Sequence, residues 1–263
     1  RTTANQCYFI IWLRMKLVAN GCSHTSGAEI EYASQNKCHD KAWPKHLANL
    51  LGYDHVNLSM SGASSHRVIR TTFEFLHKHY RENNNSFQGI FMVIMWPGWY
   101  RTEIHTEDEK VSDDSQFYDH KWAPLIVGND EHYKKSLDVN SYMYYKSWVN
   151  SVDRHQHIID YYLNIILLQN TFQKYNIPYL FWNASMNTLM AHERDYDAYS
   201  FHLSGKRFPK MLDSGACFTE LCRKSNQQIS LGSKESGFGS HYDENAHKWF
   251  AKMLHRYIKN YLL

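Results

Sequence analysis

Two side chains placed far apart in the chain have the types needed for nucleophilic chemistry. Ser23 stands in a short polar loop directly after the apolar run 17–19. A buried parallel strand ends in this way when its carboxyl edge carries chemistry, because open α/β sheets bind their ligands there. His241, near the C-terminus, is the type of residue that activates a serine as a general base. We therefore predict Ser23 as a nucleophile and His241 as its base, although a strand followed by Gly, Ser and Thr is also an ordinary turn.

A second loop supplies a candidate for stabilising negative charge on a reacting oxygen. The expected strand at 55–58 opens into the sequence SMSGASS, which contains Gly62. In a parallel sheet this loop lies on the same edge as Ser23. Gly62 lets a backbone N–H approach the developing oxyanion, beside the N–H of Ser23. We predict Gly62 as part of the catalytic site.

The elements that must position these residues alternate between strand and helix. Apolar runs at 17–19, 55–58, 89–96 and 177–182 are typical of buried strands, and helical spacing of apolar residues appears at 41–51, 65–80, 151–175 and after 241. This alternation predicts an α/β fold with three α/β/α layers and a parallel sheet. We expect residues 1–14 to lie outside the fold, and 15–263 to form one domain with an irregular, acidic and tyrosine-rich insertion around 101–147 that caps the strand ends.

Composition argues against several classes of protein. The balance of 29 basic against 26 acidic residues is too mild for a nucleic-acid binder, and no apolar run approaches the roughly 20 residues that span a bilayer. The five cysteines form no CxxC pair, and His155 and His157 do not share a helix face. We therefore expect a reduced, cytoplasmic protein without nucleic-acid or membrane partners, without a metal and without a cofactor.

The chain resembles the SGNH hydrolases, also called GDSL esterases, in three blocks. The first is Gly21-Cys22-Ser23-His24-Thr25-Ser26-Gly27, the second is Asn57 with Gly62, and the last is His241 followed by His247. The pattern looks closest to SGNH-like proteins encoded by tailed phages, in which Cys-Ser replaces Asp-Ser. This resemblance implies a flavodoxin-like parallel sheet and a serine-dependent ester hydrolase, an esterase or deacetylase acting on a small ester or an acylated carbohydrate.

The chain also departs from the family pattern. The third family block usually carries an oxyanion-binding Asn, but the chain reads Met-Trp-Pro-Gly at 95–98. Phe238 and Gly239 stand where the family places the Asp of the triad. Loss of one oxyanion donor typically costs about 10²–10³ in rate. Glu235 and Asp243 are the nearest carboxylates in sequence, and a backbone carbonyl is the other candidate for orienting the imidazole. We expect His247 to pack or cap within its helix.

The segment after the third apolar run offers weaker candidates for substrate binding, namely Trp96, Arg101 and Glu103. In an extended segment Arg101 and Glu103 point the same way. One interpretation, which we favour, is a structural Arg–Glu pair that holds the loop beneath Trp96. The other is an aromatic platform for a sugar face, with Arg101 donating to a substrate oxygen.

Two other functions stay open on the sequence alone. One is a catalytically impaired SGNH-like module that binds a glycan or has a structural role in a virus particle. The other, a flavodoxin-like nucleotide binder, is disfavoured because no glycine-rich phosphate loop of the expected spacing is present.

Overall fold

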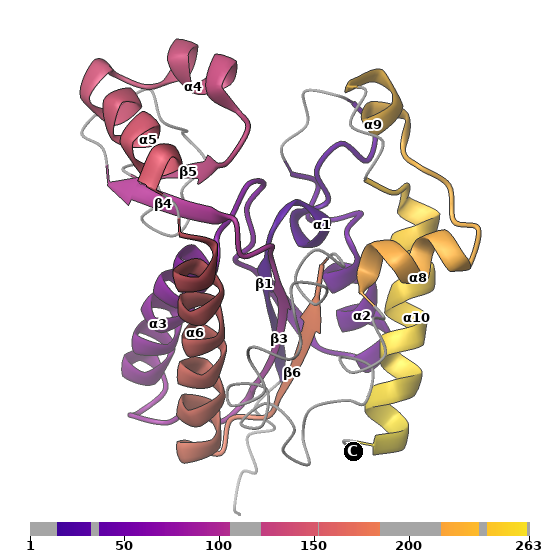
Figure 1. Cartoon of the computed structure of the whole chain (residues 1–263). Coiled ribbons are helices and arrows are strands. Elements are labelled where there is room, and N and C mark those ends of the chain that lie inside the picture. The colour runs from indigo at the N-terminus through magenta and orange to yellow at the C-terminus, as the bar shows by residue number, and fades with distance from the viewer. Residues whose placement is uncertain are drawn as a thin grey trace, which may run out of the picture.

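A four-stranded parallel sheet forms the centre of the computed structural model (Figure 1). The structure describes residues 15–32, 37–105, 122–151, 153–184, 217–236 and 241–261. The strands are β1 (Lys16–Gly21), β2 (Asp54–Asn57), β3 (Ile90–Trp96) and β6 (Tyr179–Asn183), in the order β2-β1-β3-β6. In register, Val18 of β1 lies opposite Val56 on one side and Met92 on the other. The predicted α/β class is confirmed, and the strand order is the one expected for a flavodoxin-like sheet.

Helices cover both faces of this sheet. Figure 1 shows α3 (Ser65–Glu82) and α6 (Arg154–Lys174) on one side, and α2 (Trp43–Leu51) and α10 (Glu244–Tyr261) on the other, where α8 (Phe218–Lys224) and α9 (Leu231–Ser236) also lie. Alternate residues of each strand pack against the two layers of helices. Leu17 and Ala19 pack with Phe250 under α2 and α10, whereas Val18 packs with Phe172 under α3 and α6. The three-layer prediction is therefore confirmed.

The insertion is more regular than we expected. It contains the antiparallel pair β4 (Arg101–His105) and β5 (Trp122–Ile126), then α4 (Asp130–Ser136) and α5 (Val139–Ser151). The reason is a small apolar cluster of its own, formed by Ile104, Ala123, Leu125, Tyr133 and Tyr145. Figure 1 shows these elements toward the carboxyl edge of the sheet, above α3 and α6. Residues 106–121, with most of the acidic stretch, lie outside the described residues, as do residues 1–14.

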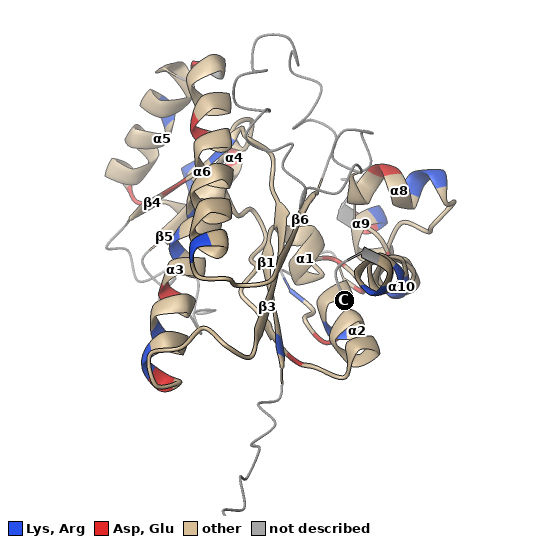
Figure 2. Ribbon diagram, turned by 90° about the horizontal axis from the view of Figure 1, so that it is seen from below, with Lys and Arg blue, Asp and Glu red and all other residues tan. Residues whose placement is uncertain are grey.

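The distribution of charged residues and the state of the cysteines can be compared with the predictions from composition. Figure 2 shows basic and acidic residues side by side on the outer helices, with the sheet between them mostly uncharged. Cys22, Cys38, Cys217 and Cys222 are free thiols. Within the described ranges, no helix has the length and apolar character to cross a membrane, and no group of three or more His, Cys, Asp or Glu residues is placed to hold a metal ion.

Candidate active site

The end of β1 turns sharply because it ends in glycine. Gly21 has φ 155°, and a Cβ atom there would lie 2.5 Å from Thr25 Oγ1 and 2.6 Å from the Met95 carbonyl oxygen. No larger residue fits between α1 (Ser23–Ser26) and the neighbouring strand β3. This close packing sets Ser23 at the carboxyl edge, immediately past β1.

Two buried asparagines hold the ends of β1 and β2 in place. The Asn20 amide donates to Thr71 Oγ1 at 2.9 Å and to Thr72 Oγ1 at 3.0 Å, which ties β1 to α3. The Asn57 amide donates to the Thr25 carbonyl at 2.9 Å, which ties β2 to α1. Buried amides are stabilising only when paired in this way, so both side chains fix the loop that carries Ser23.

Ser23 is the first residue of α1 and is 6% exposed. The first N–H groups of a helix have no acceptor within it. Here the N–H groups of Thr25 and Ser26 donate to the Cys22 carbonyl. Ser23 and His24 are the first two residues of α1, so their N–H groups have no acceptor within the helix. The Ser23 hydroxyl makes no hydrogen bond with any residue that the structure describes. Neither its hydroxyl nor its N–H is thus engaged by a described residue.

Gly62 lies in a turn closed by a hydrogen bond from the Ala63 N–H to the Met60 carbonyl. Its φ of 78° is left-handed, which favours glycine. A Cβ atom on Gly62 would lie 3.3 Å from Pro124 of β5, so the insertion packs directly on this loop. The Met60 N–H also reaches the Gly21 carbonyl at 3.4 Å, which links the turn to the end of β1.

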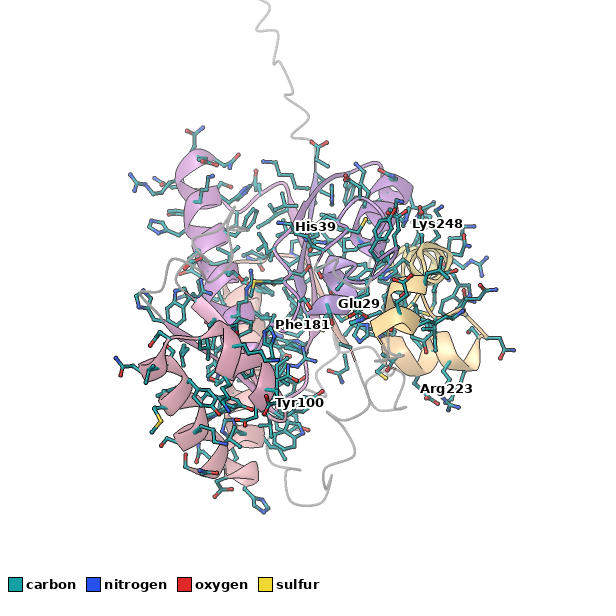
Figure 3. All side chains as sticks on the ribbon, turned by 90° about the horizontal axis from the view of Figure 1, so that it is seen from above. Glu29, His39, Tyr100, Phe181, Arg223 and Lys248 are labelled. Atoms are coloured by element: carbon teal, nitrogen blue, oxygen red, sulfur yellow. The ribbon has the colours of Figure 1, made fainter. Side chains whose placement is uncertain are left out.

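His241 has a carboxylate partner, but from a part of the chain that we did not predict. Its Nδ1 lies 2.8 Å from Glu29 Oε2, and both side chains are largely buried, at 13% and 12% exposed. Glu29 follows α1, 212 residues earlier in the sequence. Figure 3 shows Glu29 where the N-terminal part of the chain meets the C-terminal helices. A carboxylate on Nδ1 holds the proton there and leaves Nε2 to accept another.

The two carboxylates nearest to His241 in sequence are engaged elsewhere. Glu235 is exposed on α9. Asp243 Oδ1 accepts the N–H of Ala246 at 2.8 Å and so caps the start of α10. The prediction that either residue orients the imidazole is wrong. The backbone of His241 is fixed instead by a hydrogen bond of its N–H to Ser233 Oγ, at 3.1 Å.

His24, the residue after Ser23, brings His241 close to the nucleophile loop. The ring centroid of His24 lies 4.9 Å from that of His241 and 5.3 Å from that of Phe218. Burial holds the pKa of His24 well below its usual value, followed by the charges of His241 and Arg101. His24 is therefore neutral at pH 7. No hydrogen bond joins Ser23 to His241 in the described part of the chain, and such contacts often tighten only when substrate binds.

His247 has a structural environment, as expected. It is 2% exposed, and its Nδ1 accepts the N–H of Trp43 at the start of α2, at 3.2 Å. Burial lowers its pKa to about 3, so it is neutral at pH 7. An imidazole used as an acceptor for a helix N–H holds α10 against α2 and has no role as a base toward Ser23.

The weaker candidates are arranged differently from our expectation. Trp96 is 1% exposed and packs edge-on to Phe181 in the core, so it presents no face to a sugar. Glu103 pairs with Arg70 of α3 and not with Arg101, which makes the predicted Arg–Glu pair wrong. Arg101 instead donates to the Ala63 carbonyl at 3.4 Å and lies over the Tyr100 ring. Sequence spacing set the direction of both side chains but did not reveal the competing arginine.

Comparison with known proteins gives a family and a set of distant structural matches. The family model described as "Family of unknown function (DUF6071)" matches residues 27–213, and the chain belongs to that family. No curated protein matches the chain.

Three solved structures illustrate the structural matches. An acetyl xylan esterase (Est2A) from the rumen bacterium Butyrivibrio proteoclasticus has 12% identity and a TM-score of 0.46, over 94% of this chain and 64% of that chain. A carbohydrate acetylesterase family member from Sinorhizobium meliloti has 12% identity and a TM-score of 0.43, over 94% and 99%. A putative lipolytic protein of the G-D-S-L family from Desulfitobacterium hafniense has 11% identity and a TM-score of 0.41, over 92% and 99%.

This chain matches part of the Butyrivibrio enzyme. The chain spans about 64% of that enzyme's length. None of the three structures concerns phages, and the resemblance to phage-encoded proteins stays a prediction.

Proposed function

We propose that this protein is a serine-dependent ester hydrolase that removes small acyl groups, with Ser23 as nucleophile and His241 as general base. The observation that carries the proposal is the 2.8 Å contact between His241 and Glu29 beside the loop of Ser23. The histidine is oriented by a buried carboxylate, and the nearby serine hydroxyl bonds to none of the described residues. This arrangement can activate a weak nucleophile.

The reaction divides into two balanced steps. In the first, Ser23 Oγ attacks the ester carbonyl carbon while its proton passes to His241 Nε2, and the same proton then leaves with the alcohol. In the second, His241 takes a proton from water, the hydroxide attacks the acyl-serine, and the proton returns to Ser23 as the acid departs. Glu29 stabilises the imidazolium formed in each step without itself taking the proton.

The N–H groups of Ser23 and Gly62 are the proposed donors to the oxyanion. Donors fixed in advance around a developing charge supply a large share of catalysis, because they need no reorganisation during the reaction. The buried amides of Asn20 and Asn57 supply that rigidity under Ser23, and Pro124 supplies it under Gly62.

Labelling with a serine-directed phosphonate tests the proposal directly. We expect stoichiometric modification at Ser23, read by mass spectrometry of the digested protein, and no label in Ser23→Ala. Label on another serine, or no label across neutral and mildly alkaline pH in correctly folded protein, would contradict the proposal. The second result would favour a binding module that has kept the fold without catalysis.

We also propose acetyl esters on carbohydrates as substrates, in preference to long-chain acyl esters. Trp99 and Tyr100 precede β4, are partly exposed, and stand edge to face at 5.8 Å. Figure 3 shows Tyr100 on the side of the insertion. Next to Arg101, these two rings form a polar and aromatic surface that suits a sugar better than an acyl chain.

Rates on two substrate classes check this preference. We expect kcat/KM for acetylated xylo-oligosaccharides to exceed kcat/KM for a long-chain aryl ester by at least about tenfold. The reason is that a long apolar chain fits poorly on a polar surface. The matched control is an aryl acetate, which keeps the leaving group of the long-chain ester. Faster cleavage of the long chain than of the aryl acetate would overturn the carbohydrate assignment.

A further inference from the structure

Arg101 is a cation without a carboxylate partner among the described residues. Its guanidinium carbon lies 5.5 Å from the centre of the Tyr100 ring, and its Nη1 donates to the Ala63 carbonyl at 3.4 Å, a long hydrogen bond. Its Nε is buried and makes no hydrogen bond within the described part of the chain. The edge of the guanidinium formed by Nε and Nη2 therefore carries an unmet hydrogen bond at Nε, and none of the described residues makes a hydrogen bond to it.

A second arginine shows how that edge is used elsewhere in this protein. Arg70 donates from Nε and Nη2 to the two carboxylate oxygens of Glu103, at 3.0 and 2.9 Å, while its face lies 4.6 Å from the Trp122 ring. The two arginines thus share one arrangement, with an aromatic ring on the guanidinium face. They differ in that Arg101 lacks a bidentate carboxylate from the described residues. The fork of an arginine matches a carboxylate in geometry as well as charge.

The described acidic side chains at this edge do not supply the missing partner. Glu103 is taken by Arg70, and Glu29 faces His241. The charge of Arg101 acts on His24, whose pKa it helps to lower, and through Ala63 it adjoins the loop of Gly62. A partly buried charge with unmet hydrogen bonds costs free energy, which an anionic ligand at the site would offset.

We propose that the Nε–Nη2 edge of Arg101 binds a carboxylate of the substrate, so that the preferred substrate is an acetylated acidic sugar such as a uronic acid. This inference rests on the proposed function and narrows its substrate class. The carboxylate takes the position at Arg101 that Glu103 takes at Arg70, with the sugar ring toward Tyr100.

Binding without turnover tests the assignment. In Ser23→Ala, titration calorimetry compares an acetylated glucuronate oligosaccharide with its neutral glucose counterpart. We expect the acidic sugar to bind about 10- to 100-fold more tightly, the range for a charge-assisted bidentate pair. The preference for the acidic sugar should disappear with Arg101→Met and weaken with Arg101→Lys. It should persist with Arg223→Met, a control at an exposed arginine of α8. Equal affinity for the two sugars in Ser23→Ala alone would overturn the inference, whatever the folding of the Arg101 variants.

Kinetics separate this role from an oxyanion contact and from failure of the proposed function. If Arg101 binds the substrate carboxylate, Arg101→Met lowers kcat/KM for the acidic ester much more than kcat/KM for an aryl acetate, whereas Arg223→Met lowers neither. Equal losses on both esters would assign Arg101 to the oxyanion and contradict the carboxylate site. A tight, acid-selective interaction in a wild-type protein that hydrolyses neither ester would uphold the binding site and refute the hydrolase.

Discussion

Replacing His241 by alanine is expected to lower kcat for a short-chain aryl ester by about 10³- to 10⁴-fold or more, the effect of removing a general base together with its proton relay. The side chain contacts Glu29 and His24 at the carboxyl edge and is 13% exposed. Its removal should leave the fold intact, because the neighbouring hydrogen bond to Ser233 comes from the backbone. Steady-state kinetics and circular dichroism of the same preparation measure both effects.

The matched control is the other buried histidine at this end of α10. His247→Asn keeps an acceptor for the Trp43 N–H, and we expect nearly full activity with some loss of stability. His247→Ala should be less stable by about 1–3 kcal/mol, because it leaves a buried N–H unpaired. Equal losses of activity in His241→Ala and His247→Asn, with both proteins folded, would refute the assignment of His241 as base.

Replacing Glu29 by glutamine is expected to lower kcat by about 10²- to 10⁴-fold, the range for a lost orienting carboxylate. The amide is nearly the same size, so the packing around α1 stays. It no longer stabilises the imidazolium, and it can stabilise the wrong tautomer by donating to Nδ1. Because KM reflects substrate contacts that Glu29 does not make, the loss should fall on kcat.

Two other carboxylate variants serve as controls for Glu29. Glu235→Gln and Asp243→Asn should keep full activity, since the first residue is exposed and the second caps α10. Full activity in Glu29→Gln would contradict the triad and favour a Ser–His pair. A large loss of activity in Asp243→Asn, with α10 still helical, would show that Asp243 is the acid of the triad.

The sequence was sufficient to predict the elements that carry the site. The apolar run before Trp96 became β3, buried along its whole length, and the helical pattern before Gly52 became α2 with a left-handed glycine at its end. Such patterns are local and result from burial on one or both faces. They placed the loops of Ser23 and Gly62 on one edge, because parallel strands end together.

Contacts between distant loops could not be predicted in the same way. Glu29 stands in a polar loop with no spacing that links it to His241, and only the packing of α9 beside that loop brings the two together. A Cβ atom on Gly232 of α9 would lie 2.6 Å from the Glu29 carbonyl oxygen, which shows how close this approach is. Likewise, the spacing that places Arg101 and Glu103 on one face of the strand does not indicate that Arg70 of α3 pairs with Glu103.

The contact between Glu29 and His241 has a consequence for synthesis of the chain. Ser23 and Glu29 leave the ribosome before His241, which lies 212 residues beyond Glu29. A nascent polypeptide therefore holds the nucleophile long before it holds the base, and no folding intermediate in which His241 has not docked beside Glu29 has an imidazole oriented by that carboxylate. Hydrolysis, once it appears, reports that the segment carrying His241 has been synthesised and has docked beside Glu29.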